Sequence, residues 1–204
     1  SSLGANLAVA VRIPVIAGTD EAGRGPLAGP VVAAAAILTA EQRKILVAAG
    51  LRDSKKLTEK KRERLFARIC ELGVVWRAQA ASPGVIDRIN ILQASLWCMK
   101  RAVLSLCVWP DLVVVDGNKL IPDFPIRQKC VVKGDDKVPA IAAASVIAKV
   151  LRDRVMLSLD KLYPQYGFAK HKGYPCAAHM KIIAEIGPSP VHRLTFGGVR
   201  EHLR

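Results

Sequence analysis

Short apolar runs of strand length alternate along this chain with longer segments of helical periodicity. The apolar runs are residues 15–20, 30–38, 74–80, 112–115 and 126–132, and a glycine-rich turn joins the first two. Residues 58–72, 91–107, 139–162 and 176–186 have helical length and spacing, whereas residues 163–175 indicate a loop. Alternating strands and helices are typical of α/β folds, in which helices cover the faces of a sheet. We therefore expect an α/β protein with a mixed central sheet flanked by helices.

The length of the chain limits it to one sizeable core. A chain of 204 residues is long enough to bury such a core and short for two domains of ordinary size. Its last part has the pattern of helices rather than strands. We expect one domain over residues 1–204, with a core over about 13–162 and a helical C-terminal extension over about 163–204.

The chain is strongly basic. Its 31 Lys and Arg against 17 Asp and Glu give a formal charge of +14, which favours polyanionic partners such as nucleic acid. Residues 43–68 hold ten basic and three acidic residues, among them Lys55. Such a run also occurs on a merely solvated helix face. In a chain that is basic throughout, we interpret it as a phosphate-contacting surface.

Cysteine usage and hydropathy favour a cytoplasmic protein without a membrane partner. The five cysteines are scattered and form no Cys-x-x-Cys pair, which argues against a disulfide framework and a zinc ribbon. Cys176 and His179 have a ligand-like spacing but no accompanying second pair. No apolar stretch has the roughly 20 residues of a membrane span, and no signal peptide is recognisable. Neither a dimerisation helix nor a motif for binding a replication clamp is evident, so we expect a monomer.

Four acidic residues each end an apolar run or precede a helix beside glycine. They are Asp20, Glu21, Asp116 and Asp135. Ligands gather at the carboxyl ends of strands in α/β sheets, and carboxylates are the ligands that magnesium prefers. If the strands are neighbours, these acids would share two cations about 4 Å apart, as in two-metal phosphoryl-transfer enzymes. The alternatives are local: Asp-Gly is a common turn pair, and Asp135 or Asp136 would also cap the following helix.

Two further segments have the composition of substrate contacts. Gly23, Arg24 and Gly25 follow the acidic pair, and glycine allows positive φ and close approach of backbone amides to a sugar or phosphate. Tyr174, next to Lys172, offers an aromatic face for stacking beside a cation. The alternatives are a polar turn between two strands and a rigid turn with a surface tyrosine.

The chain resembles bacterial ribonuclease HII, the type 2 ribonuclease H, along nearly its whole length. The resemblance rests on these segments: GTDEAGRGPLAGPVVAAA (18–35), DSKKLTEKKRE (53–63), IDRINILQA (86–94), VVVDGN (113–118), VVKGDDKVPAIAAASVIAKVLRD (131–153), HKGYP (171–175) and HRLTFGGV (192–199).

The resemblance implies a fold, an activity and roles for the residues. It implies a ribonuclease H-like core with a helical C-terminal extension and an endonuclease, dependent on Mg²⁺ or Mn²⁺, that cleaves RNA in RNA·DNA hybrids. Nicking 5′ of single ribonucleotides embedded in duplex DNA, which leaves 3′-hydroxyl and 5′-phosphate ends, is also implied. The four acids would be catalytic metal ligands, the Gly-Arg-Gly loop would sense the ribose 2′-hydroxyl, and Tyr174 would stack beneath the next deoxyribose. Lys55 and Lys172 would hold phosphates.

Departures from the family pattern are few. Asp136 stands where relatives often have a small residue, so the fourth acid is ambiguous by one place, although the Lys-Gly-Asp match favours Asp135. Thr195 and Gly198 replace residues that are frequently serine and proline, which concerns packing. Type 3 relatives carry an extra N-terminal domain that we do not expect here. The competing functions are a non-catalytic nucleic-acid-binding module and a DNA nuclease or transposase-like enzyme on the same core.

Overall fold

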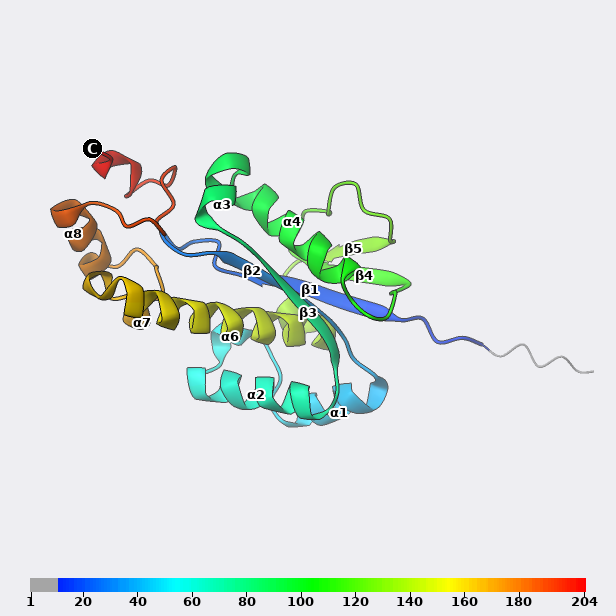
Figure 1. The fold of residues 1–204 in the computed structure, drawn as a ribbon. Helices are drawn as coiled ribbons and strands as arrows, with labels where there is room; N and C mark the ends of the chain where they lie inside the picture. The colour runs from blue at the N-terminus through cyan, green and yellow to red at the C-terminus, as the bar shows by residue number, and fades with distance from the viewer. Residues whose placement is uncertain (1–10) are drawn as a thin grey trace, which may run out of the picture.

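A mixed five-stranded sheet forms the centre of the computed structural model, which describes residues 11–204 (Figure 1). The strands are β1 (Ile16–Ala22), β2 (Val31–Ile37), β3 (Val75–Ala81), β4 (Leu112–Asp116) and β5 (Gln128–Val131). Their order is β3-β2-β1-β4-β5, in which β2 runs antiparallel to both neighbours and β1, β4 and β5 run parallel. The expected α/β class, mixed sheet and hairpin-like opening are therefore confirmed.

The register of the sheet brings two acidic residues together. Gly18 of β1 pairs with Val114 of β4. Because side chains alternate between faces, Asp20 and Asp116, each two residues further along its strand, project from the same face. Two acids that are far apart in the sequence thus lie side by side at the strand ends.

Helices cover both faces of the sheet (Figure 1). One face packs against α3 (Pro83–Ile89) and α4 (Ile91–Leu104), and the other against α1 (Ala40–Ala48), α2 (Glu59–Glu71) and α6 (Pro139–Leu162). The alanines of β2 show the division: Ala33 and Ala35 join the α4 side of the core, and Ala34 and Ala36 join the α6 side. Small side chains on both faces let the helices approach closely.

Helix α6 lies unusually close to β1 at its first turn. A Cβ atom at Gly18 would lie 2.4 Å from the carbonyl carbon of Ala140 and 2.4 Å from the backbone nitrogen of Ile141. Only glycine fits such an approach. The contact sets the beginning of α6, and the short turn before it, beside Asp20.

The four predicted helices are α2, α4, α6 and α8 (Ala177–Ile186), and each begins within one residue of its expected start. Thr58 caps α2 by accepting a hydrogen bond from the Lys61 amide, and Gly73 follows its end with φ of +67°. Leu65 and Ile69 are buried on its inner face, as their spacing predicted. Trp97 of α4 is 40% exposed and carries Arg101 over its ring.

The C-terminal extension is helical, with more helix than we expected. It contains η2 (Pro164–Tyr166), α7 (Phe168–His171), α8 (Ala177–Ile186) and η3 (Arg200–His202). The interpretation of residues 163–175 as a loop was therefore wrong in part, and helices α1 and α3 were not predicted. A bridge between Ala28 and His192 joins the extension to the segment before β2. In Figure 1 the extension lies beyond the end of α6.

Candidate active site

Three carboxylates from three separate segments converge at the sheet edge. Asp20 ends the buried part of β1, Asp116 ends β4, and Asp135 lies in the short helix α5 (Gly134–Lys137). One carboxylate oxygen of each lies within 4.8 Å of those of the other two. Among residues 11–204 this is the one group of three or more His, Cys, Asp or Glu side chains with such a spacing. Cys176 and His179 do not form a metal group there.

Asp116 organises the turn that brings Asp135 into the cluster. Its Oδ1 accepts hydrogen bonds from the backbone amides of Gly134 (2.8 Å) and Asp135 (3.3 Å). Lys133, with φ of +53°, reverses the chain between β5 and this turn. The acid of one strand therefore fixes the loop that carries the next acid, which the sequence spacing alone does not show.

Burial and neighbouring negative charge raise the pKa of Asp20 and of Asp135. Desolvation, followed by the charges of Glu21 and Asp116, holds the pKa of Asp20 well above its usual range. Desolvation and the neighbouring Asp53 and Asp116 raise the pKa of Asp135 to about 6. Buried like charges at this spacing are unfavourable without a counterion. The donor set, all hard oxygen, matches the preference of divalent magnesium or manganese.

Glu21 lies beside the three-carboxylate group rather than within it. Its Oε1 is 3.7 Å from Nη1 of Arg24, and within residues 11–204 its buried Oε2 has no hydrogen-bond partner. Burial raises the pKa of Glu21, and Arg24 opposes that shift. An unsatisfied buried carboxylate oxygen has a cost that a bound cation would remove. The observation fits Glu21 as an outer member of a cation site.

Asp53 and Lys55 form the opposite wall of the site. A cavity of about 320 Å³ is lined by Asp53, Lys55, Lys56, Asp116, Lys133, Asp135 and Asp136. Burial lowers the pKa of Lys55, but the surrounding carboxylates, beginning with Asp53 and Asp135, raise it by more. Asp53 caps η1 (Ser54–Lys56) by accepting from the Lys55 amide at 2.9 Å. Lys55 was predicted as a substrate contact and Asp53 was not, although both stand in the DSKK segment.

Asp136 lines the same cavity but is not part of the three-carboxylate group. Its carboxylate pairs with the ammonium group of Lys56 at 2.6 Å, and this partner lowers its pKa. The geometry thus separates the two adjacent acids: Asp135 joins the three-carboxylate group, and Asp136 makes a partly exposed ion pair.

A buried arginine, Arg193, supports the Gly-Arg-Gly loop by hydrogen bonds to its backbone. Arg193 is fully buried and donates to three carbonyl oxygens: Nε to Gly29 (3.0 Å), Nη1 to Arg24 (3.1 Å) and Nη2 to Gly23 (2.6 Å). Of the two loop glycines, Gly23 has a positive φ, +97°, whereas Gly25 does not. The loop carbonyls therefore point inward to Arg193.

A second buried arginine ties this loop to the segment that carries Tyr174. Arg152 of α6 donates to the carbonyl oxygens of Pro30 (2.9 Å), Lys172 (2.8 Å) and Ala28 (2.9 Å). Burial lowers the pKa of Arg152 to about 10 and that of Arg193 to about 9. Neither arginine was predicted. The signal was present in α6, where Ala148, Arg152 and Met156, four residues apart, form one buried stripe.

Tyr174 lies against the Gly-Arg-Gly loop. A Cβ atom at Gly25 would lie 3.6 Å from the Tyr174 ring, which is 41% exposed. The ring also faces the ammonium of Lys149 at 5.7 Å. Lys172, by contrast, is committed to its own turn, because its ammonium donates to the Ala169 carbonyl. Its predicted phosphate contact stays a prediction.

A chain of hydrogen bonds through two buried histidines ends at the backbone carbonyl of Tyr174. The Ser189 amide donates to Nδ1 of His192 (2.9 Å), Nε2 atoms of His192 and His179 are 2.8 Å apart, and Nδ1 of His179 faces the Tyr174 carbonyl (2.9 Å). An amide can only donate and a carbonyl can only accept, so His192 carries its proton on Nε2 and His179 on Nδ1. Both rings are therefore neutral. Burial lowers the pKa of His192 to about 3, in agreement with that state.

Comparison with known proteins identifies the chain. A family model described as Ribonuclease HII matches residues 17–199. The chain belongs to the ribonuclease HII family. It is 54% identical to Ribonuclease HII of Geotalea daltonii over 189 residues, which cover 93% of this chain and 85% of that one.

Solved ribonucleases of this type share the fold. The ribonuclease H2 of Pyrococcus horikoshii is 28% identical, with a TM-score of 0.77, and the match covers 92% of this chain and 96% of that one. The ribonuclease HII of Archaeoglobus fulgidus, solved in complex with PCNA, is 26% identical, with a TM-score of 0.76 and coverage of 93% and 97%. The ribonuclease H-like fold that the resemblance implied is thus confirmed.

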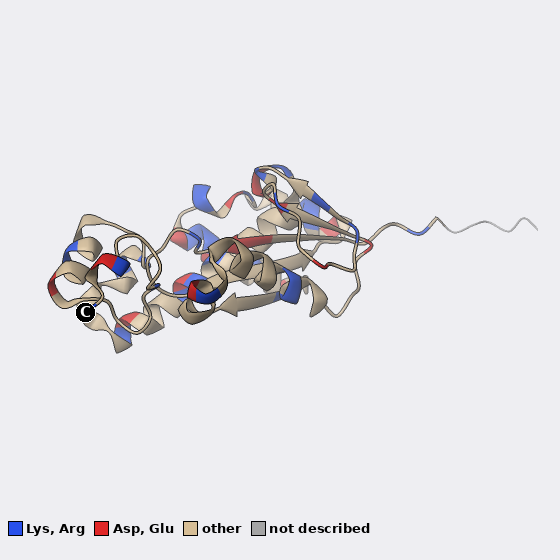
Figure 2. Cartoon of the chain, turned by 90° about the horizontal axis from the view of Figure 1, so that it is seen from above, with Lys and Arg blue, Asp and Glu red and all other residues tan. Residues whose placement is uncertain are grey.

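Membership of the ribonuclease HII family establishes the general activity. The protein is a ribonuclease H, a hydrolase that cleaves RNA within RNA/DNA hybrids, and the family depends on divalent metal ions. A basic surface suits that substrate: Lys and Arg are distributed over helices and loops along the whole molecule, not only over residues 43–68 (Figure 2). None of the helices formed by residues 11–204 has the length and apolarity of a membrane span.

Proposed function

We propose that this ribonuclease HII nicks duplex DNA 5′ of single embedded ribonucleotides, as well as cleaving longer hybrids. In this proposal Asp20, Glu21, Asp116 and Asp135 hold two Mg²⁺ or Mn²⁺ ions, and the products carry 3′-hydroxyl and 5′-phosphate ends. The supporting observation is the convergence of three carboxylates from β1, β4 and α5 within 4.8 Å of one another. In this proposal the protein acts on nucleic acid as a monomer in the cytoplasm.

The residues present suit paired divalent cations. The cluster offers oxygen ligands alone, and burial followed by neighbouring negative charge raises the pKa of Asp20 and of Asp135. The unsatisfied Oε2 of Glu21 would extend the cluster by one ligand. When bound, two such ions activate the attacking water and stabilise the leaving oxygen. The protein's own contribution is to hold the carboxylates in place through β1, β4 and the turn capped by Asp116.

The loop and the tyrosine would supply selectivity for ribose. Tyr174 packs against Gly25, so a sugar that rests on the ring would meet the backbone of the Gly-Arg-Gly loop. The 2′-hydroxyl distinguishes RNA from DNA at one position, and backbone groups read it without base specificity. Arg152 and Arg193 join the core and the extension through loop carbonyls, which supports treating residues 1–204 as one functional domain.

The test is a nicking assay on three matched duplexes. One carries a single ribonucleotide, one has a continuous RNA strand, and one is all DNA; each is incubated with Mg²⁺, with Mn²⁺ and with a chelator. We expect metal-dependent cleavage of the first two and none of the third, with a single nick 5′ of the ribonucleotide. Cleavage of the hybrid alone would overturn the embedded-ribonucleotide proposal, and cleavage of all-DNA duplex would overturn the ribose reading.

Adjacent acids provide a matched pair of variants for the metal assignment. Asp135→Asn removes a carboxylate from the cluster, whereas Asp136→Asn removes one that is paired with Lys56 outside it. Loss of an outer partner of a metal site typically costs about 10–100-fold, so loss of a ligand should cost more than about 100-fold in turnover. Equal activity of the two variants would contradict the assignment of Asp135.

A further inference from the structure

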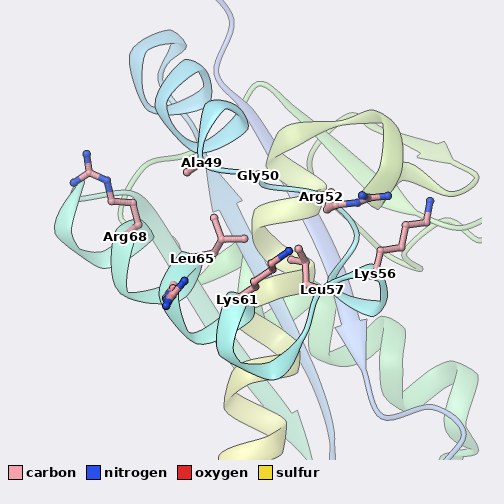
Figure 3. A pocket seen from close by; sticks show the side chains of 9 residues that line it. Ala49, Gly50, Arg52, Lys56, Leu57, Lys61, Leu65 and Arg68 are labelled. Carbon is pink, nitrogen blue, oxygen red and sulfur yellow. The ribbon is translucent and has the colours of Figure 1, made fainter.

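A basic groove lies between the C-terminal end of α1 and helix α2 (Figure 3). It encloses a cavity of about 510 Å³, larger than the cavity beside the carboxylates. Five cationic side chains line it: Arg52, Lys56, Lys61, Arg64 and Arg68. All five are exposed.

The cations of the groove are largely without acidic partners. Lys56 pairs with Asp136, and Arg68 lies 3.3 Å from the exposed Glu71. Within the part of the chain that the structure describes, no carboxylate lies within ion-pair distance of Arg52, Lys61 or Arg64. Lys61, Arg64 and Arg68 are spaced three and four apart on α2, where like charges oppose one another. A bound polyanion would relieve that repulsion.

The floor of the groove is already part of the core. Leu57 and Leu65 are only 8% and 4% exposed and pack with the α6 side of the core. These two leucines therefore offer little of their own surface to a partner. Guanidinium and ammonium groups line the groove around them, and the arginine fork suits the geometry of phosphate.

The groove continues from the catalytic cavity. Lys56 lines both cavities, and its partner Asp136 follows Asp135 directly. A duplex whose scissile phosphate lies over the carboxylates would thus meet the groove with neighbouring phosphates. Phosphate contacts of this kind fix the register of a protein on a duplex without reading sequence.

We propose that this groove binds backbone phosphates of the substrate duplex to one side of the cleavage position, with Arg52 and Arg64 as its unpaired anchors. The inference rests on the proposed function and adds a second binding site to it. The ligand of the groove in this proposal is the phosphate backbone of nucleic acid, and not an acidic protein surface.

The test compares two double variants that remove the same charge. Arg52→Ala/Arg64→Ala removes the two anchoring arginines of the groove. Arg88→Ala/Arg101→Ala removes two exposed arginines from α3 and α4 on the opposite face of the sheet. Binding to a long duplex with one ribonucleotide is measured in chelator against salt concentration, and thermal unfolding verifies the fold of each variant. Because each lost phosphate contact lowers the log-log salt slope by about 0.9, the groove variant should lose about 1.8. Between about 50 and about 200 mM salt, wild type should then lose about tenfold more affinity than that variant.

A truncation series locates the contact. Duplexes are shortened one base pair at a time from either end, and the affinity difference between wild type and the groove variant should vanish on shortening from one end only. An equal fall of the slope in both double variants, an unchanged slope in the groove variant, or symmetric truncation profiles would each overturn the proposal. Because these measurements contain no metal, they stay interpretable even if wild type fails the nicking assay, so the two failures are distinguishable.

Discussion

Replacing Arg193 with methionine removes the support of the Gly-Arg-Gly loop while keeping a long side chain in the same space. The buried guanidinium donates three hydrogen bonds, at 3.0, 3.1 and 2.6 Å, to the carbonyls of Gly29, Arg24 and Gly23. Hydrogen bonds from a charged group contribute about 1.5–3 kcal/mol each. The sum overstates the loss, because methionine no longer requires a buried charge to be desolvated.

We expect Arg193→Met to lower the free energy of unfolding by about 3 kcal/mol, the lower end of what breaking a buried charged network costs. For a chain of this size that corresponds to a fall in Tm of about 6–12 °C. Catalytic efficiency should fall by about 100-fold, since a displacement of about 1 Å in a positioning loop has that effect. Arg193→Lys should recover little of either, because one ammonium group cannot serve three divergent carbonyls.

The assay is denaturant unfolding together with kcat/KM on the single-ribonucleotide duplex. Arg200→Met is the control, because Arg200 is exposed on the same terminal segment and should change stability by less than about 0.5 kcal/mol. If Arg193→Met unfolds within about 1 kcal/mol of wild type and retains its kcat/KM, the loop is held by its other contacts and the reasoning fails.

Four further predictions concern the site and its supports. Asp20→Asn should abolish metal-dependent cleavage in a gel assay while duplex binding in chelator persists, because binding rests mainly on phosphate neutralisation; full cleavage would end the metal-site proposal. Gly23→Ala should lower the free energy of unfolding by about 2 kcal/mol or more, since φ is +97° and the new Cβ would lie 2.1 Å from Nε of Arg152; a neutral result in denaturant titration would contradict this. Tyr174→Ala should lower nicking at single ribonucleotides more than cleavage of continuous hybrid, and a parallel loss on both substrates would argue against junction reading. The pKa of His192 is about 3 in the folded chain, below its usual 6.5, so the unfolded chain takes up this proton first as the pH falls. The contribution of neutral His192 to the free energy of unfolding is therefore complete above about pH 6.5 and decreases as the pH falls towards 3, by about 2 kcal/mol between pH 7 and 5. Unfolding of His192→Asn across that range should show a shallower pH dependence.

Local signals account for most of the secondary structure. Apolar runs of strand length and the helical spacing of residues 58–72 predicted their elements because backbone propensity and periodicity act over a few residues. Two missed helices also had local signals: Thr39 with Gln42 makes a capping box before α1, and Ser82 with Pro83 begins α3. Both helices were therefore recognisable from the sequence alone.

The candidate site was predictable in composition but not in assembly. Asp20, Asp116 and Asp135 were recognisable because each follows an apolar run beside glycine, and the resemblance to ribonuclease HII assigned them a role. Their meeting within 4.8 Å depends on the parallel pairing of β1 with β4 and on the close approach of α6 at Gly18. Asp136, identical in type and adjacent, is directed to Lys56 by the same turn. Propensity and spacing do not distinguish the two acids, and only the Lys-Gly-Asp match to the family favoured Asp135.

Strand and helix identity, overall charge and family membership thus follow from the order of residues, because they depend on short-range periodicity and on composition. The buried supports of the site do not. Arg152 stands on the inner stripe of α6, but its position there does not reveal its partners, and Arg193 has no such local signal. Both are fully buried, and each donates to a carbonyl oxygen more than 100 positions away. Burial of a charge is favourable only where its partners are already arranged around it, and that arrangement exists only in the folded chain.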